Sequence, residues 1–532
     1  MKSLFSVLTL LLHFSVCAQY PVVTIDQETT GPNEPSIYIN PLNVAQIVAG
    51  SNIKNHYVSA DTGKTWQIKS LQSSYGVYGD PVIYADDYGN FYYCHLAATK
   101  TKKFPNWIDR IIVQKSNDGG LNFSDGCDVG FNNDKVQDKH WLVKDEHSVL
   151  HSNNLYLSWT EFDKYESSNI NDRSRIRFAR SVNGAESFEP AITISDTSGD
   201  CLDDDNTLEG ATPAIGKNGE VCIAWSGFGN IYFDKSLDGG LTWGTDRIIA
   251  KQDGGWALSF DQIYRSNGLP FLVADHSRSK FKNRLYLLWG ECLPLIGGEI
   301  KLKYSDNGGD TWSDEIAVNS HSAGDQFMPH IAIDQSDGTV YIVFYDRSRY
   351  ASNILMDVCV AYSKDGGQTF ITKKINSSPI IPPGPSVFFG DYNGISAHSG
   401  IIRPICTGTD ETLKGKLNIQ TALLNKTLLE NKNQILTDTT IFKYFEGENQ
   451  NTFVLYKYGS YEYKIRIKVK KHKYSPFGKK FEISGSLYKH KDIMIFDADH
   501  SEVFLNTSKG RYVALKMRLN GENFDKKYLM KL

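Results

Sequence analysis

Residues 59–66 read Ser59-Ala-Asp-Thr-Gly-Lys-Thr-Trp66, and this octapeptide pattern returns through the chain. In general form it is Ser-x-Asp/Asn-x-Gly-x-Thr-Trp/Phe, with modest variation, and it occurs six times. The opening serines are 55 to 69 residues apart, which fits one four-stranded β-propeller blade with loops of variable length. The sequence therefore predicts a repeated sheet. The other copies span 116–123, 181–188, 236–243, 305–312 and 363–370.

The residue types of the pattern suit a tight hairpin turn. The Asp or Asn accepts hydrogen bonds from nearby backbone N–H groups, and the Gly adopts positive φ. The closing Trp or Phe packs against the sheet and holds the turn in place. We therefore interpret these octapeptides as structural elements that lie away from any active site.

The number of blades follows from the strands between these turns. Apolar or alternating segments surround each copy, as buried blade strands require. A seventh unit has three strand-like segments, at 391–397, 401–406 and 417–422, but no octapeptide. Residues 22–25 near the N-terminus can supply its outer strand and close the ring. The prediction is an all-β chain with seven blades, six blades being the alternative.

The octapeptide resembles the Asp-box (BNR) repeat of sialidases and related propellers, over about residues 30–422. The resemblance implies a propeller in which each box links the third and fourth strands of a blade. It also implies a glycan ligand and the activity of an exo-glycosidase. A catalytic sialidase has six blades, so a count of seven bears on that activity.

Composition and the chain ends predict the domains and the compartment. Residues 1–18 have the charged start, short apolar run and small residues of an export signal, which implies a secreted, periplasmic or cell-surface protein. The propeller is assigned to 20–422, and a basic β-rich C-terminal domain to 426–532. No later segment is apolar enough to span a membrane, and the net charge of −4 does not favour nucleic acid.

Carboxylates recur where the innermost strands are expected to begin. A propeller would bring them into a ring around one mouth of the channel, where crowded acids raise one another's pKa or recruit a cation. The alternative is that each acid accepts backbone N–H bonds at its own strand. The acids are Glu34, Asp80, Asp138, Glu209 and Asp391, with Asp325 near the sixth blade.

The sialidase resemblance implies a Tyr nucleophile activated by Glu, an Asp as acid/base, and three arginines that bind the sugar carboxylate. Tyr392 and Glu209 match the first pair, Asp80 the acid, and Asp391 is a further catalytic candidate. The substrate-binding candidates are Arg347, Arg349, Arg403, His140 and His330. The family's Arg-Ile-Pro motif is absent, because Glu34-Pro35-Ser36 stands at the comparable place.

The loop 196–206 is rich in acids separated by short polar residues. Asp200, Asp203 and Asp205 suit calcium, which prefers oxygen ligands, although the spacing differs from an EF-hand. A solvated acidic loop is the alternative. The leading functional prediction is a glycan-directed hydrolase. A non-catalytic propeller that binds a glycan, protein or cation is the second, and chemistry on an anionic polysaccharide the third.

Overall fold

The computed structural model describes residues 20–430 except 28, 99–107, 294–295, 320–323, 351 and 410–415, and beyond them the backbone of six strands. The export signal predicted at 1–18 lies outside the described residues. The chain divides into two units, one spanning Tyr20–Asn431 and one containing the C-terminal strands. No helix in the described part is both long and apolar enough to cross a membrane.

Seven four-stranded antiparallel blades form the larger unit, within the described residues. The first three blades are β2 (Ser36–Ile39), β3 (Ile47–Ser51), β4 (Asn55–Ser59) and β5 (Gln67–Ser70); β6 (Val82–Ala85), β7 (Phe91–Ala97), β8 (Arg110–Ser116) and β9 (Cys127–Val129); and β10 (Val136–Lys144), β11 (Leu155–Phe162), β12 (Ser174–Ser181) and β13 (Ile192–Thr193).

The next three blades follow the same order. They are β14 (Glu209–Ile215), β15 (Val221–Gly227), β16 (Asn230–Ser236) and β17 (Arg247–Lys251); β20 (Phe271–Ala274), β21 (Leu285–Leu293), β22 (Gly297–Ser305) and β23 (Ile316–Ala317); and β24 (Gln326–Asp334), β25 (Thr339–Asp346), β26 (Asp357–Ser363) and β27 (Ile371–Lys374). A hairpin of β18 (Ala257–Leu258) and β19 (Ser266–Asn267) stands between the fourth and fifth blades.

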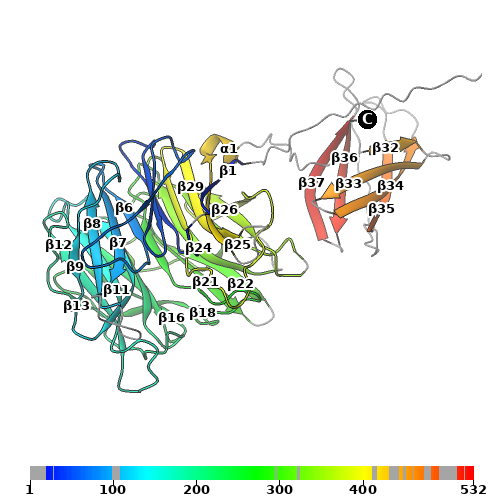
Figure 1. Cartoon of the computed structure of the whole chain (residues 1–532). Helices are drawn as coiled ribbons and strands as arrows, with labels where there is room; N and C mark the ends of the chain where they lie inside the picture. The colour runs from blue at the N-terminus through cyan, green and yellow to red at the C-terminus, as the bar shows by residue number, and fades with distance from the viewer. Residues whose placement is uncertain are drawn as a thin grey trace, which may run out of the picture. The chain divides into compact units, whose positions relative to one another are not determined.

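The seventh blade joins both ends of the propeller. It consists of β28 (Gly394–His398), β29 (Ile401–Thr409), β30 (Leu417–Ala422) and β1 (Val22–Asp26). Val22 of β1 pairs with Ala422 of β30, so the predicted closing strand is confirmed (Figure 1). Residues 391–393, predicted as strand, precede β28 instead. A short strand β31 (Leu424–Asn425) and the helix α1 (Lys426–Glu430) follow.

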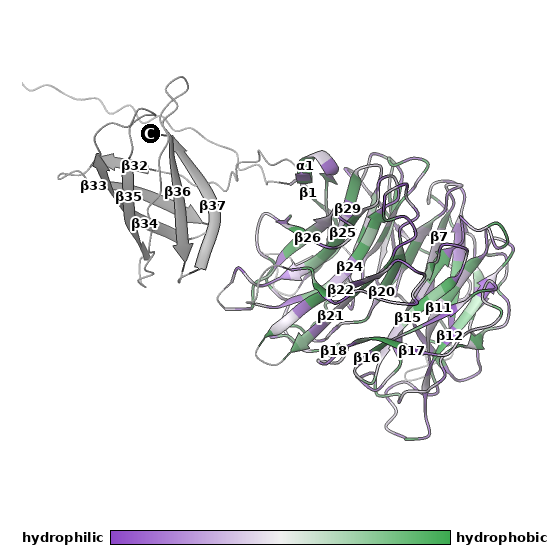
Figure 2. Cartoon of the chain, turned by 180° about the vertical axis from the view of Figure 1, so that it is seen from behind, coloured by the Kyte–Doolittle hydropathy of each residue, from purple (hydrophilic) through white to green (hydrophobic). Residues whose placement is uncertain are grey.

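The blades surround a common axis. Each inner strand contacts the inner strand of the next blade, and β28 of the seventh blade contacts β2 of the first. Apolar residues follow the strands while hydrophilic residues concentrate in the loops (Figure 2). The core is therefore a series of layers between adjacent sheets, in which Trp159, Trp225 and Trp289 are completely buried.

All six octapeptides form the same turn between the third and fourth strands. In the fourth blade, Ser236 Oγ accepts from Gly240 N at 2.8 Å and donates to Asp238 at 2.7 Å. Asp238 also accepts from the backbone and hydroxyl of Thr242. The turn therefore has the structural role that the sequence predicts.

The C-terminal unit also contains strands. One sheet has β32 (Lys443–Glu446), β33 (Asn451–Tyr458), β34 (Tyr461–Lys471) and β35 (Phe481–Lys489), and a hairpin has β36 (Tyr512–Leu519) and β37 (Glu522–Lys531). In the described part of the propeller the cysteines are free, including Cys127 and Cys201.

Candidate functional site

The candidate site lies on the propeller axis, at the end where the inner strands begin. We call this end the entry face. Just inside it, Trp141 of the third blade contacts Phe271 of the fifth, His330 of the sixth and Tyr392 before the seventh, with ring centroids 5.1 to 5.7 Å apart. These four aromatic side chains come from four different blades and meet near the axis. The acids at the strand entries lie on the entry side of them.

Backbone conformation at the strand entries directs side chains toward the axis. Glu34 and Asp80 adopt left-handed φ near +50° just before an inner strand. Lys139, Gly210 and Met328 also have positive φ, at the points where the pairing of β10, β14 and β24 with the next strand is interrupted. Non-glycine residues pay a conformational cost in this region, and such residues gather at functional sites. In the fourth blade the left-handed position is taken by Gly210, so the acid stands one residue earlier, at Glu209.

Lys139 joins acids from three blades. Its Nζ lies 2.7 Å from Asp391 Oδ2, 3.3 Å from Asp80 Oδ2 and 4.0 Å from Asp138 Oδ1. The side chain is only 8% exposed, so these ion pairs are shielded from water and from screening by salt. The ring of acids predicted from the repeat therefore contains an ammonium group at its centre.

Arg265 extends this network from the β18–β19 hairpin. Its guanidinium binds Asp391 with two nitrogens, at 2.6 and 3.1 Å, and donates from Nη1 to Asp203 at 3.0 Å. The Tyr165 hydroxyl donates to the same Asp203 oxygen at 2.6 Å. Arg265 is 37% exposed and Asp203 13%, so this part of the network is open to solvent.

We define the mouth cluster as Glu34, Asp80, Asp138, Lys139, Asp203, Glu209, Arg265 and Asp391. Burial is the largest influence on its acids. It raises the pKa of Glu209 well above the ordinary value, with the charges of Asp203 and Asp138 adding to the effect. Burial and the charge of Asp80 likewise raise the pKa of Glu34.

The pKa values of two further acids of the cluster shift in opposite directions. Burial raises the pKa of Asp138 to about 7, although Lys139 opposes the change. Burial also favours protonation of Asp391, but Arg265 and Lys139 outweigh it and hold its pKa below the ordinary value. The cluster thus combines protonated carboxyls with a firmly ionised carboxylate, as acid/base chemistry requires.

The predicted histidines and tyrosine support the site from below. Burial lowers the pKa of His140 to about 4 and of His330 to about 3, so both stay neutral. The Tyr392 hydroxyl donates to the Pro81 carbonyl at 3.2 Å, and its ring packs on Trp141. Tyr392 is therefore bound in the core, and Tyr165 is the tyrosine that faces an acid of the mouth cluster.

The three arginines predicted to bind a substrate are each engaged with other groups of the protein, and none of them contacts the mouth cluster in the hydrogen bonds and ion pairs that the structure describes. Arg347 is completely buried and donates to the carbonyls of Asn353 and Asp261, and Arg349 pairs with Asp357. Arg403 donates to the carbonyls of Thr62, Ile402 and Leu424. Each guanidinium satisfies local backbone or acid groups, which a sequence comparison of loop positions does not reveal.

The acidic loop 200–205 does not form one oxygen cage. Asp200 accepts from the Thr207 hydroxyl, Asp205 accepts from Ala257 N, and Asp203 binds Arg265 and Tyr165. No group of three or more acidic, His or Cys side chains in the described part is arranged to hold a metal ion. The predicted calcium site therefore remains a prediction without geometric support.

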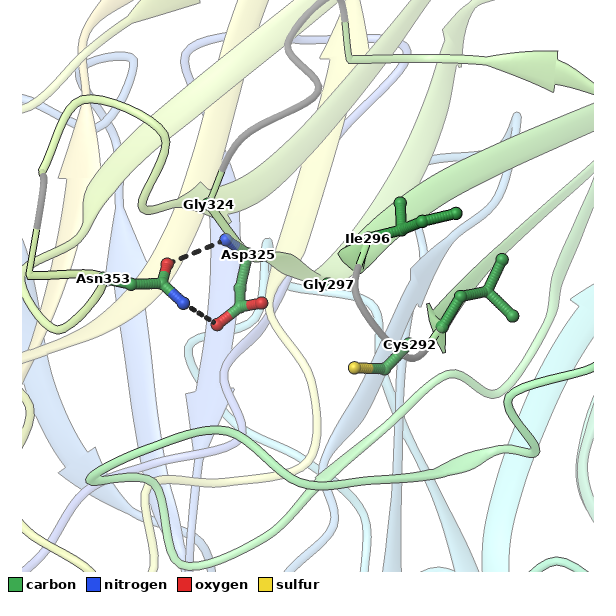
Figure 3. Close-up of a pocket in the computed structure, with 7 residues that line it drawn as sticks. Cys292, Ile296, Gly297, Gly324, Asp325 and Asn353 are labelled. Carbon is green, nitrogen blue, oxygen red and sulfur yellow. Dashed lines mark hydrogen bonds between the residues drawn. The ribbon is translucent and has the colours of Figure 1, made fainter.

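A separate pocket of about 540 Å³ lies beside the tip of β21 and β22 (Figure 3). Figure 3 shows Asp325 and Asn353 paired there: Asp325 N donates to Asn353 Oδ1 at 3.0 Å, and Asn353 Nδ2 donates to Asp325 Oδ2 at 2.7 Å. Asp325 also accepts from Gly298 N. None of the residues that line this pocket belongs to the mouth cluster, and Asp325 serves to hold loops together.

Lys139, Arg265 and Tyr165 were missed as site residues. One feature of the sequence could have identified Lys139, because it lies in the strand-entry segment that corresponds to those of Glu34 and Asp80. Arg265 and Tyr165 come from loops of irregular length, so their positions in the sequence carry no such signal.

No family model and no curated protein sequence matches the chain. Among solved structures, an ulvan lyase bound to the saccharide -[GlcA(1-4)Rha3S]- is similar at 10% identity, over 76% of this chain and 96% of that one, with a TM-score of 0.45. The NanB sialidase of Streptococcus pneumoniae shares 10% identity over 72% and 84% of the chains, with a TM-score of 0.41.

An α-L-arabinofuranosidase of Fusarium graminearum is similar at 11% identity, over 76% of this chain and 98% of that one, with a TM-score of 0.41. These neighbours are glycan-active propeller enzymes. At such identities and scores, their similarity carries no argument about activity. The strand pairing of the chain itself defines it as a seven-bladed β-propeller.

Proposed function

We propose that the entry face binds a glycan and that the mouth cluster hydrolyses a glycosidic bond. The observation that carries this proposal is that one cluster combines Asp138, whose pKa is raised to about 7, with Asp391, whose pKa is lowered by ion pairs with Arg265 and Lys139. Glycoside hydrolysis uses one protonated carboxyl and one carboxylate. Two carboxyl groups whose surroundings move their pKa values apart are the pattern from which these two roles are assigned.

In this proposal Asp138 is the general acid. Its proton passes to the glycosidic oxygen as the bond to the anomeric carbon breaks, and the leaving group departs as an alcohol. Asp203 stabilises the positive charge that develops on the sugar. The oxygen of a water molecule then bonds to the anomeric carbon, and a proton of that water returns to Asp138. Tyr165 and Arg265 position Asp203 through hydrogen bonds of 2.6 and 3.0 Å.

The test is hydrolysis of a panel of fluorogenic glycosides by the full chain. We expect Asp138→Asn and Asp203→Asn each to lower kcat/KM at least about 100-fold, since acid catalysis contributes that much or more. Asp314→Asn, on an exposed acid outside the cluster, is the matched control. Turnover that survives in both cluster variants, with unchanged folding, would refute the assignment.

A binding propeller without catalysis is the second candidate. It is favoured by burial, because Glu209 is completely buried and Asp138 is only 6% exposed, with its Oδ1 4.0 Å from the Lys139 ammonium. Such acids also serve to fix loops around the axis. Saturable glycan binding with no turnover of any glycoside would select this candidate.

A further inference from the structure

The mouth cluster has an excess of acid. It contains six carboxyl groups and two cations, and both cations are already engaged with Asp80, Asp203 and Asp391. Six carboxyl groups thus share one ammonium and one guanidinium, so the cluster contains more acid than its own cations can neutralise. The field of such a site repels anions and attracts cations.

Glu209 provides a second, independent observation. It is completely buried, and neither Oε1 nor Oε2 has a hydrogen-bond partner among the described residues. Its neighbours include the carboxyls of Asp203 and Asp138, and a side-chain interaction with Asp203 contributes to the raised pKa of Glu209. Buried polar atoms without well-formed hydrogen bonds are uncommon in native proteins, so a buried carboxyl beside other carboxyls points to a hydrogen-bonding group that the cluster itself does not supply.

The cluster offers little to an anionic sugar. Arg265 makes its contacts to Asp391 and Asp203, while Lys139 contacts Asp391 and Asp80. A sugar carboxylate or sulfate would have to displace one of these acids from its cation. Recognition of such groups normally uses an available Arg fork, and the three predicted arginines are occupied elsewhere.

We propose that the mouth cluster selects glycans that carry a protonated amine, the class of 2-amino-2-deoxy sugars with a free amino group. The ammonium donates to the partly exposed carboxylates of Asp80 and Asp203, which are 15% and 13% exposed. It adds the positive charge and the N–H donors that the cluster lacks. This inference rests on the proposed glycan function and names its substrate class.

The test compares three probes of equal length on the full chain: a glucosamine hexamer, its fully N-acetylated counterpart, and a hexamer of galacturonate. Calorimetry at pH 6 and low salt measures each Kd. We expect the free amine to bind at least about tenfold more tightly than the acetylated form, and the anionic hexamer more weakly still. The preference for the amine should shrink as salt is raised, because screening weakens exposed charge pairs.

Asp80→Asn and Asp203→Asn test the named carboxylates, with Asp314→Asn as the matched control. Each cluster variant should reduce the preference for the amine, whereas the control should retain it. The comparison of probes on the unaltered chain does not depend on how the variants fold.

The outcomes separate the two proposals. Equal binding of the amine and its acetylated form, or tighter binding of the anionic hexamer, overturns the amine inference and leaves a glycan-binding function. The amine inference is also overturned if Asp80→Asn and Asp203→Asn both retain the preference for the free amine over the acetylated form. If none of the three hexamers binds, and no glycoside of the wider panel is bound or hydrolysed, the proposed function fails as well.

Discussion

Arg403 of the seventh blade donates from Nε to the carbonyl oxygen of Thr62 in the first blade, at 2.7 Å. Thr62 is the fourth residue of its octapeptide, and the same carbonyl is reached from the preceding blade elsewhere in the ring. The equivalent pairs are Lys115 with Gly184, Arg180 with Gly239, Lys235 with Gly308, and Arg284 with Gly366. Arg403 therefore extends this repeated contact across the closure of the propeller.

Arg403→Ala should destabilise the propeller by about 3 kcal/mol, because three carbonyl oxygens lose the guanidinium that donates to them. The measurement is the free energy of unfolding in denaturant. Arg278→Ala, on an exposed arginine, should change it little. If the two variants unfold alike, the contact does not contribute to ring closure.

Asp138→Asn should stabilise the folded chain at pH 8 and have little effect at pH 4. Burial raises the pKa of Asp138 in the folded state to about 7, above its ordinary value of 3.8. Between these values the folded chain binds more protons than the unfolded one, so stability falls as pH rises through this range.

Asn, which carries no ionisable proton, removes that loss, on the order of 4 kcal/mol at pH 8. Thermal unfolding at several pH values measures it. A Tm that drops equally at pH 4 and pH 8 would contradict the assignment.

The pH dependence of hydrolysis should follow the same group. A general acid acts while protonated, so kcat/KM should decline above pH 7 as Asp138 ionises. Full pH profiles of the unaltered chain and of Tyr165→Phe measure this. The Phe variant should lower activity but retain the alkaline limb, because Tyr165 positions Asp203 and leaves Asp138 in place. An alkaline limb that moves with Tyr165 would assign the acid elsewhere.

Gly210→Ala should cost about 3 kcal/mol and displace Glu209. Gly210 has φ of +75°, and an added Cβ would meet Leu269 side-chain atoms at 2.8 Å. Gly384→Ala is the control for backbone strain alone. Gly384 also has positive φ, but no atom lies within 4 Å of a Cβ added there. It should cost about 1 kcal/mol. Equal losses would show that overlap with Leu269 is unimportant.

Asp238→Ala should destabilise the fourth blade by about 1 kcal/mol, whereas Asp238→Asn should be nearly neutral. Asn occupies this place in two other octapeptides, at Asn183 and Asn307. Its Oδ1 accepts the same backbone N–H, and its Nδ2 donates to the hydroxyl that donates to the carboxylate in the Asp turns. Partial burial opposes ionisation, but hydrogen bonds from Thr242 and Ser236 lower the pKa of Asp238 to about 2. The stability that ionised Asp238 adds should therefore be lost as pH falls to about 2, so the difference between the unaltered chain and Asp238→Ala should shrink there, which acid unfolding curves can measure.

The acids of the site could be predicted in part. The octapeptide aligns the blades, and the alignment identifies Glu34, Asp80 and Asp138 as strand-entry acids that share one axis. The sequence could not show whether the predicted arginines bind a substrate, because the guanidinium of a loop arginine can donate to nearby backbone carbonyls as readily as to a ligand. Arg347 illustrates this, since its guanidinium is bound to loop carbonyls beneath the surface.

The sequence alone determined the repeat, the seven blades and the closing strand, because turn chemistry and strand alternation are local and recur with each blade. Only the tertiary structure decided which side chains meet at the mouth. Lys139 and Asp391 are 252 residues apart, and Arg265 reaches Asp391 from a hairpin outside the blade pattern. Such contacts depend on loop paths and on burial around the axis, and neither is encoded in the spacing of the repeat.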